Sequence, residues 1–173
     1  MSAPVRVRPA VRADMPRIWQ LLRGLAEYER WEEYVTGTPE RLEALLFDEP
    51  ARGEALVAER AQYGAAGGTE LAIVGYALFY PTLSSFRTQT RLWLEDLFVD
   101  PAERGGGVGR ALLASLARLA LERGHTQIQW HVLDWNAPSI AFYERLGAVR
   151  WATDVYTYAF PEDALRALAA GND

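Results

Sequence analysis

A glycine-rich turn between an apolar segment and a helical pattern constrains this chain more than any other feature. The apolar segment spans Glu95 to Pro101 (EDLFVDP), and the turn spans Arg104 to Arg110 (RGGGVGR). Glycines at such a junction let successive backbone N–H groups converge on an anion, because no Cβ atom stands in the way. The helix that follows adds the positive end of its dipole. The turn therefore predicts a phosphate or pyrophosphate site, with an ordinary helix-capping glycine turn as the alternative.

The spacing of the turn excludes two common phosphate-binding motifs. A nucleotide P-loop ends in Gly-Lys-Ser/Thr, whereas an arginine and an alanine follow the last glycine here. The dinucleotide fingerprint needs glycine at its sixth position, which is Arg110 in this chain. The spacing Arg-x-x-Gly-x-Gly, formed by Arg104, Gly107 and Gly109, instead resembles the acetyl-CoA pyrophosphate loop of the GNAT superfamily of N-acetyltransferases.

Hydrophobic periodicity predicts a single α+β domain over residues 1–173. Strands are expected at 5–8, 55–60, 70–80, 91–99, 126–133 and 155–160, with a loose hairpin at 64–68. Helices are expected to begin at Asp14, Thr38, the glycine turn, Asn136 and Pro161, and Asp14 and Thr38 are suited to cap theirs. This order of elements predicts a mixed, mostly antiparallel central sheet flanked by helices.

Composition narrows the class of protein further. The chain has 18 Lys and Arg against 23 Asp and Glu, a net charge of −5, so we expect no nucleic-acid partner. Cysteine is absent, which excludes a disulfide framework, a thiolate metal site and a cysteine nucleophile, and two histidines do not suggest a metal site. No apolar run approaches the roughly 20 residues that span a bilayer. With no signal-peptide pattern in residues 1–9, we expect a cytoplasmic protein without membrane partners.

A second motif lies about 30 residues downstream. The segment Trp135 to Ala148 (WNAPSIAFYERLGA) resembles the N-x-x-[SA]-x-x-[FL]-Y-x-x-x-G-[FA] helix that GNAT enzymes place beside the CoA arm. Each piece has a plainer explanation: Asn136 as a helix cap, Phe142 as core and Tyr143 as amphipathic helix surface. The order and spacing of the two motifs nevertheless identify the chain as similar to GNAT enzymes, which implies the GNAT acyl-CoA N-acyltransferase fold.

The resemblance extends to the diamine acetyltransferases that act on spermidine, spermine or thialysine. It covers segments 8–10, 25–29, 32–33, 94–99, 104–109 and 135–148, and it implies a homodimer that uses acetyl-CoA as co-substrate. It implies that the acetyl and pantetheine arm is lined by Leu97, Phe98 and Val99. It places the pyrophosphate on Arg104, Gly105, Gly106, Gly107, Val108, Gly109 and Arg110, and further CoA contacts on Asn136, Ala137, Pro138 and Ser139.

The same resemblance implies that Tyr143 is the general acid and that Tyr28, Glu29, Glu95 and Asp96 face the amine. Chemistry supports such roles, because an alkyl ammonium with a pKa near 10.4 costs about 4.6 kcal/mol to deprotonate at pH 7. Glu95 interrupts an apolar run and is the best general base, with a salt bridge inside the sheet as the alternative. Tyr143 stays protonated at pH 7 and can protonate a departing thiolate. Without a cysteine, we expect direct transfer in a ternary complex.

Two further segments bear on the acceptor. An acidic, aromatic run at 27–34 suits either a cationic ligand or a solvated helix end. The loop 83–87 carries Arg87 and lacks the acid that diamine enzymes tend to have there, which favours a short, lysine-like amine over spermine. Two alternatives remain open: a protein or peptide N-acetyltransferase, and a catalytically silent CoA-binding module.

Overall fold

The structure, a computed structural model, describes residues 4–63, 68–151, 157 and 159–169, and it divides into two compact units, residues 1–131 and 132–173. Each unit is described by itself. The second unit contains α4 (Ala137–Arg145) and α5 (Glu162–Ala169). The first unit contains β1 (Val5–Pro9), η1 (Arg12–Asp14), α1 (Met15–Glu29), η2 (Glu32–Tyr34), α2 (Pro39–Phe47), β2 (Glu54–Tyr63), β3 (Thr69–Ser84), β4 (Gln89–Val99), η3 (Pro101–Glu103), α3 (Val108–Glu122) and β5 (Ile128–Gln129).

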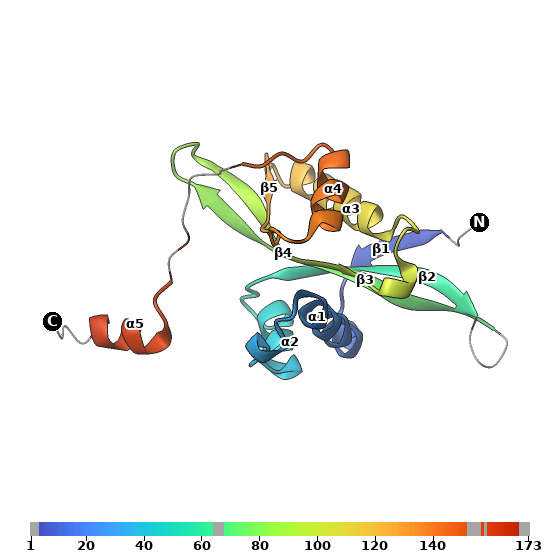
Figure 1. Cartoon of the computed structure of the whole chain (residues 1–173), viewed down its shortest axis with the longest axis horizontal. Coiled ribbons are helices and arrows are strands. Elements are labelled where there is room, and N and C mark those ends of the chain that lie inside the picture. Colours follow the sequence, from blue (N-terminus) through green and yellow to red (C-terminus); the bar gives the residue numbers. More distant parts are fainter. Residues whose placement is uncertain (1–3, 64–67, 152–156, 158, 170–173) are drawn as a thin grey trace. The chain divides into compact units, whose positions relative to one another are not determined.

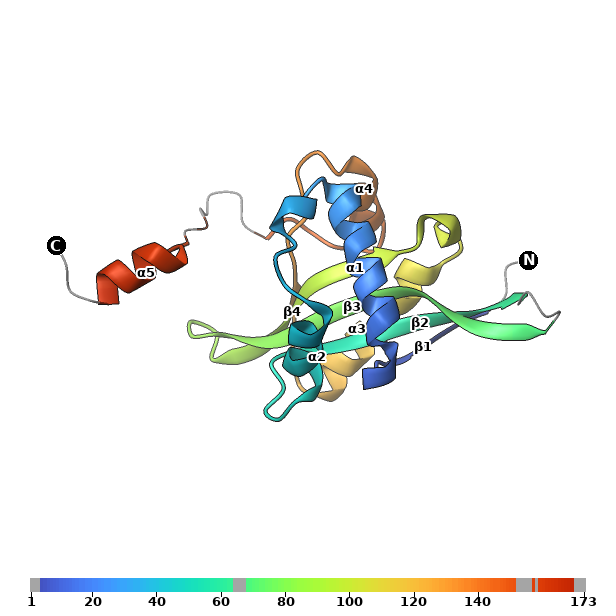
Figure 2. The same cartoon turned by 90° about the horizontal axis from the view of Figure 1, so that it is seen from below.

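The first unit is built on one five-stranded sheet with the order β1-β2-β3-β4-β5. Strands β1 to β4 are antiparallel to their neighbours, and β5 is parallel to β4. Helices α1 and α2 cover one face and α3 covers the other, as Figures 1 and 2 show from two directions. The expected mixed, mostly antiparallel sheet flanked by helices is confirmed.

Each face of the sheet has its own hydrophobic core. The α3 core centres on Leu112 and Leu116, which pack against Leu92, Leu94 and Phe79 of the sheet. The core under α1 and α2 is made by Met15, Ile18, Leu21, Leu46, Val57, Tyr76 and Phe98, among others. The alternation of side chains along a strand supplies both cores from the same strands, since successive residues point to opposite faces.

Two expectations about the last strands need correction. The strand expected at 126–133 is only Ile128–Gln129, which pairs with Leu92 and Trp93 just before β4 bulges at Glu95 and breaks the regular ladder. The strand expected at 155–160 lies mostly outside the described residues, and residues 157, 159 and 160 belong to no strand.

The two predicted helix caps behave differently. Thr38 caps α2, because its hydroxyl accepts the N–H of Arg41. Asp14 occupies the N-cap position of α1, but its carboxylate makes no capping hydrogen bond. It accepts instead the N–H of Val11 at 2.8 Å and two hydrogen bonds from the Arg8 guanidinium. The capping expected of Asp14 is therefore wrong, because its carboxylate binds the Arg8 guanidinium in place of the N–H groups of the helix.

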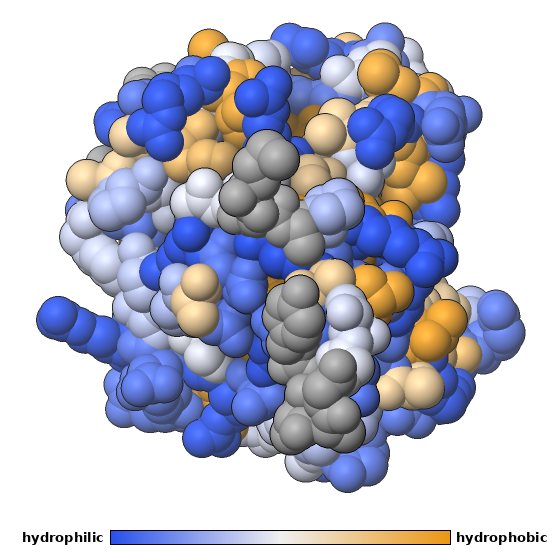
Figure 3. All heavy atoms as spheres, turned by 90° about the vertical axis from the view of Figure 1, so that its right-hand side faces the viewer, coloured by the Kyte–Doolittle hydropathy of each residue, from blue (hydrophilic) through white to orange (hydrophobic). Residues whose placement is uncertain are grey.

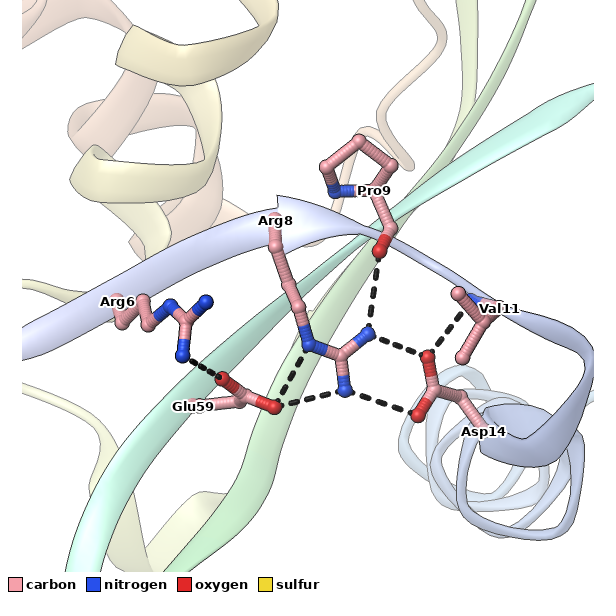
Figure 4. A network of polar contacts seen from close by, with 6 residues as sticks. All are labelled: Arg6, Arg8, Pro9, Val11, Asp14 and Glu59. Carbon is pink, nitrogen blue, oxygen red and sulfur yellow. Dashed lines mark hydrogen bonds and ion pairs between the residues drawn. The ribbon is translucent and has the colours of Figure 1, made fainter.

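Arg8 links the first strand, β1, to β2 and to the start of α1 (Figure 4). Its guanidinium contacts Asp14 at 2.6 Å and Glu59 of β2 at 2.7 Å, and Arg6 lies 3.9 Å from the same glutamate. The guanidinium lowers the pKa of Asp14, so this carboxylate stays ionised at neutral pH. The network fixes the entry of α1 over the sheet.

One face of the molecule is mostly polar. Figure 3 shows a face on which hydrophilic residues predominate and apolar residues form separate small patches. None of the helices in the described part of the chain is long and apolar enough to cross a bilayer.

Candidate active site

The glycine turn connects β4 and η3 to the N-terminus of α3, as its sequence predicts. Gly105 and Gly107 have φ angles of +76° and +82°, a left-handed conformation that residues with a Cβ adopt rarely. Gly107 is the N-cap of α3. Because the first N–H groups of a helix have no acceptor within it, this turn presents donors and the positive end of the α3 dipole at one place.

A buried arginine holds the turn from beneath. Arg60 of β2 is only 6% exposed. Its guanidinium donates to the carbonyl of Gly106 at 2.5 Å and to the Glu103 carboxylate at 2.5 Å. A Cβ on Gly106 would lie 2.6 Å from this guanidinium, so a larger residue there would force the Arg60 side chain to shift. Arg60 was not predicted from the sequence, where it is one of several polar residues of this strand, next to Glu59.

Arg104, at the start of the turn, packs on aromatic rings. Its guanidinium lies 4.7 Å from the ring centre of Tyr28 and 5.3 Å from that of Phe98, and its Nε donates to the carbonyl of Val99 at 3.2 Å. Cation–π contacts of this kind fix a long side chain in one place. The structure thus brings a residue predicted for the cofactor next to Tyr28, which was predicted for the amine.

The strand before the turn changes face at Glu95. Leu78 of β3 pairs with Asp96 and Phe79 pairs with Leu94, which leaves Glu95 as an extra, bulged residue. Leu92 and Leu94 therefore face α3, while Asp96 and Phe98 face α1. Of the other predicted cofactor residues, Leu97 and Val99 pack against the α3 core.

Glu95 is exposed and is held by two neutral donors. The Tyr80 hydroxyl donates to its Oε2 at 2.9 Å and the Trp93 indole N–H donates to the same oxygen at 2.8 Å. The Trp93 ring packs edge-on against His131, with ring centres 4.7 Å apart. Among the described residues Glu95 forms no ion pair, so the alternative of a salt bridge within the sheet is wrong. Its carboxylate is oriented yet remains open to a ligand.

Asp96 lies beside Glu95 but in a drier place. Its Oδ2 accepts the hydroxyl of Tyr76, a fully buried residue, at 3.0 Å. Burial raises the pKa of Asp96 to about 6, and the negative charges of Glu95 and Glu29 add to this rise, against the lowering effect of the Tyr76 hydrogen bond. Burial and the same carboxylate raise the pKa of Tyr76. The Asp96 carboxylate is thus a group that a cation would stabilise.

Asp96 opens into a cavity of about 430 Å³ between α1, η2 and α2. Glu29 also lines it, and burial raises the pKa of this glutamate. Most of the other wall residues are aromatic or aliphatic: Trp19, Leu22, Leu25, Ala26, Trp31, Tyr34, Val35, Leu42 and Leu45. A mostly apolar pocket with a few convergent polar groups is the usual form of a small-molecule site.

The acidic run at 27–34 divides between the two explanations that the sequence left open. Glu29, Trp31 and Tyr34 line the cavity, and the last two rings form an edge-to-face pair at 5.9 Å. Glu27, Glu32 and Glu33 are exposed and do not line it. One acid of the run therefore belongs to the cavity, and the others form a solvated face.

The second motif lies in the second unit. Asn136 caps α4, because its side-chain oxygen accepts the N–H of Ser139 at 3.3 Å, and Ala137 and Pro138 form the first turn of this helix. Tyr143, in the last turn of α4, is half-buried, and its ring centre lies 5.2 Å from that of Phe142. The helix and its cap are those that the sequence predicts.

No group of three or more metal-ligating side chains occurs in the part of the chain that the structure describes.

Comparison with known proteins bears on the family and the fold of the chain. Residues 18–148 match the model of a family described as "Acetyltransferase (GNAT) family".

Two relatives and one solved structure illustrate the match. A thialysine N-epsilon-acetyltransferase of Bos taurus is 35% identical over 168 residues, which cover 95% of this chain and 97% of that protein. An L-ornithine N5-acetyltransferase of Arabidopsis thaliana is 35% identical over 79 residues, 46% of this chain and 35% of that protein. An integron cassette protein from the mobile metagenome of V. cholerae has the same fold, with a TM-score of 0.72, 20% identity and 98% coverage of both chains.

Proposed function

Because this chain belongs to the acetyltransferase (GNAT) family and is an acetyl-transferring enzyme, we propose that it moves the acetyl group of acetyl-CoA to a primary amine of a small molecule. The observation that carries the proposal is the bulge of β4, which sets an exposed carboxylate, Glu95, beside a cavity that contains Asp96 and Glu29. A carboxylate held by neutral donors, next to a cavity that attracts cations, suits an amine acceptor.

The glycine turn supplies the site for the cofactor. Residues 105–110 and the N-terminus of α3 would bind the pyrophosphate of CoA, with Arg104 and Arg110 adding positive charge. The side chains of Leu97, Phe98 and Val99 pack into the two cores, so this segment would contact the acetyl and pantetheine arm mainly through its main chain. Asn136, Ala137, Pro138 and Ser139 are proposed as the second CoA-binding segment.

The chemistry is a direct transfer. Glu95 accepts a proton from the ammonium, directly or through water, and the freed nitrogen forms a bond to the acetyl carbon. The carbon–sulfur bond breaks, and Tyr143 gives its proton to the sulfur that leaves. Positioning of the two substrates supplies much of the acceleration, since no covalent intermediate with the enzyme is involved.

The test is a panel of amines assayed with acetyl-CoA by release of free thiol. We expect turnover on thialysine, lysine, ornithine or short diamines, and little on peptides. Tight binding of acetyl-CoA without turnover on any amine would establish the silent CoA-binding module instead, and turnover confined to peptides would establish the protein acetyltransferase.

The role of Tyr143 has its own test. Tyr143→Phe keeps the ring and removes the proton, so acetyl-CoA affinity is expected to stay while kcat falls well over tenfold. Unchanged turnover would remove Tyr143 from the mechanism. A homodimer and a cytoplasmic location are further parts of the proposal, to be checked by light scattering of the purified protein and by cell fractionation.

A further inference from the structure

The cavity between α1, η2 and α2 contains charges of both signs. Glu29 and Asp96 provide its carboxylates, and Arg41 of α2 is the one positively charged residue among those that line it. A cavity for a simple diamine or polyamine would need only negative charge. Opposite charges in one small cavity instead fit a ligand that carries both an ammonium and a carboxylate.

The Arg41 guanidinium is available to such a ligand. Arg41 is exposed on α2, and its guanidinium forms no hydrogen bond or ion pair with the described residues, while its backbone N–H donates to the Thr38 hydroxyl. Other arginines of this unit are engaged: Arg12 with Glu43 and Asp48, and Arg60 with Glu103. Guanidinium groups hold carboxylates through two parallel hydrogen bonds, a geometry that a free arginine at a cavity wall can offer.

The carboxylates of the cavity lack cationic partners. Among the described residues, neither Glu29 nor Asp96 forms an ion pair, and Asp96 accepts only the neutral Tyr76 hydroxyl. Most of the remaining wall is aromatic and aliphatic, which suits a short methylene chain. The cavity thus offers a guanidinium for an anion, carboxylates for a cation and an apolar wall.

We propose, on the basis of the proposed function, that the acceptor is an amino acid with a second amine on its side chain, and that Arg41 binds its α-carboxylate. The side-chain amine then lies toward Asp96 and Glu95, where it is acetylated. Arg41 is a specificity-determining residue in this assignment, because it attracts the carboxylate of an amino acid and repels the distal ammonium of a polyamine.

The test compares each amino acid with its decarboxylated counterpart: L-lysine with cadaverine, and L-ornithine with putrescine. Arg41→Ala is expected to raise KM for the amino acids by about tenfold to a hundredfold, the usual loss of a charge-assisted hydrogen bond. The KM values for the diamines should stay the same or fall, because the repulsion of their second ammonium is removed, and the kcat values should stay within about twofold. Arg41→Glu should lower KM for the diamines and so reverse the preference.

The matched control is Arg118→Ala on α3, which removes the same charge from the surface of the opposite face, where its guanidinium donates to Ser115 alone among the described residues. It should change neither class of substrate. A calorimetric titration of L-lysine into the wild-type protein and Arg41→Ala, without acetyl-CoA, gives a readout that does not depend on turnover. Weaker binding in the variant supports the assignment.

Two results overturn the assignment and leave the proposed function intact: equal KM changes for amino acids and diamines in Arg41→Ala, or wild-type turnover confined to amines without a carboxylate. Wild-type protein that binds acetyl-CoA but acetylates no amine at all would instead overturn the proposed function. The failures of the two ideas are therefore distinguishable.

Discussion

The glycine turn and the cavity lie on the same sheet but treat charge in opposite ways. Around the turn, Arg60 is paired with Glu103, Arg17 with Asp100, and Arg104 is stacked on aromatic rings. Around the cavity, Glu29, Asp96 and Arg41 have no ionic partners among the described residues. The arginines around the turn are already paired or stacked, whereas the charged side chains of the cavity are left for a ligand to pair.

Because of this contrast, the two regions differ in what ligand binding costs and in how they affect the stability of the free protein. A preformed turn binds its anion with little rearrangement, which preserves the affinity of its contacts. Unpaired, partly buried charges lower the stability of the free protein, and a ligand that pairs them recovers that free energy on binding. Four substitutions test this difference between the two regions.

The largest effect is expected for Glu95→Gln. The amide oxygen can still accept the Tyr80 and Trp93 hydrogen bonds, so the site keeps its shape but loses its base. We expect kcat to fall by about a hundredfold or more, with KM for acetyl-CoA within about twofold, as steady-state kinetics would show. Glu33→Gln, on the exposed face of η2, is the control. A kcat within threefold of the wild type would place the base elsewhere.

The next effect is expected at the turn itself. Arg60→Met removes the support of the Gly106 carbonyl and leaves Glu103 without its partner. We expect KM for acetyl-CoA to rise about tenfold, with KM for the amine nearly unchanged. Arg60→Lys can form only part of this network, so its KM for acetyl-CoA should lie between those of the wild type and Arg60→Met. If both Michaelis constants rise equally in Arg60→Met, the arginine stabilises the fold as a whole and not the turn.

Asp96→Asn tests how much the ionised carboxylate of Asp96 lowers the stability of the free protein. The raised pKa of Asp96 means that its ionisation costs stability, a cost that is absent below about pH 4 and complete above about pH 6. Asparagine can accept the Tyr76 hydroxyl without a charge, so the free energy of unfolding should rise by up to about 3 kcal/mol at pH 8 and hardly at all at pH 4. Urea unfolding at both pH values measures this. The same variant should bind the amine more weakly. A gain that is equal at both pH values would contradict the assigned pKa.

The smallest effect is expected for Tyr80→Phe. It removes one of two donors to Glu95, and Trp93 still holds the same oxygen, so kcat should fall only about threefold. In the Glu95→Gln background the substitution should have no further effect on kcat. An equal loss in both backgrounds would show that Tyr80 acts independently of Glu95.

The sequence predicted the features that depend on neighbouring residues. The turn at 104–110, the cap at Thr38 and the cap at Asn136 are set by local geometry, because glycine conformation and side-chain caps act within a few positions. Alternation at 5–8 and apolar segments at 55–60, 70–80 and 91–99 likewise predicted the sheet strands up to 99, although the observed strands extend further.

What the sequence could not predict depends on contacts between distant segments. Arg60 reaches Gly106 across 46 positions, and nothing near either residue signals that contact. The length of β5 depends on how far its partner β4 stays regular, and the periodicity of residues 126–133 carries no information about β4. The cavity required the packing of α1 against α2, and Arg41 therefore drew no attention as part of a site.

The bulge at Glu95 also makes this enzyme unusually sensitive to chain length in β4. Substituting Glu95 removes one functional group, but deleting it would leave a regular alternation, in which either the residues before it or those after it must reverse direction. If the residues before it reversed, Leu92 and Leu94 would leave the α3 core. If those after it reversed, Asp96 would enter that core. Because the proposed general base is itself the bulged residue, insertions and deletions here should be tolerated far less well than any single replacement.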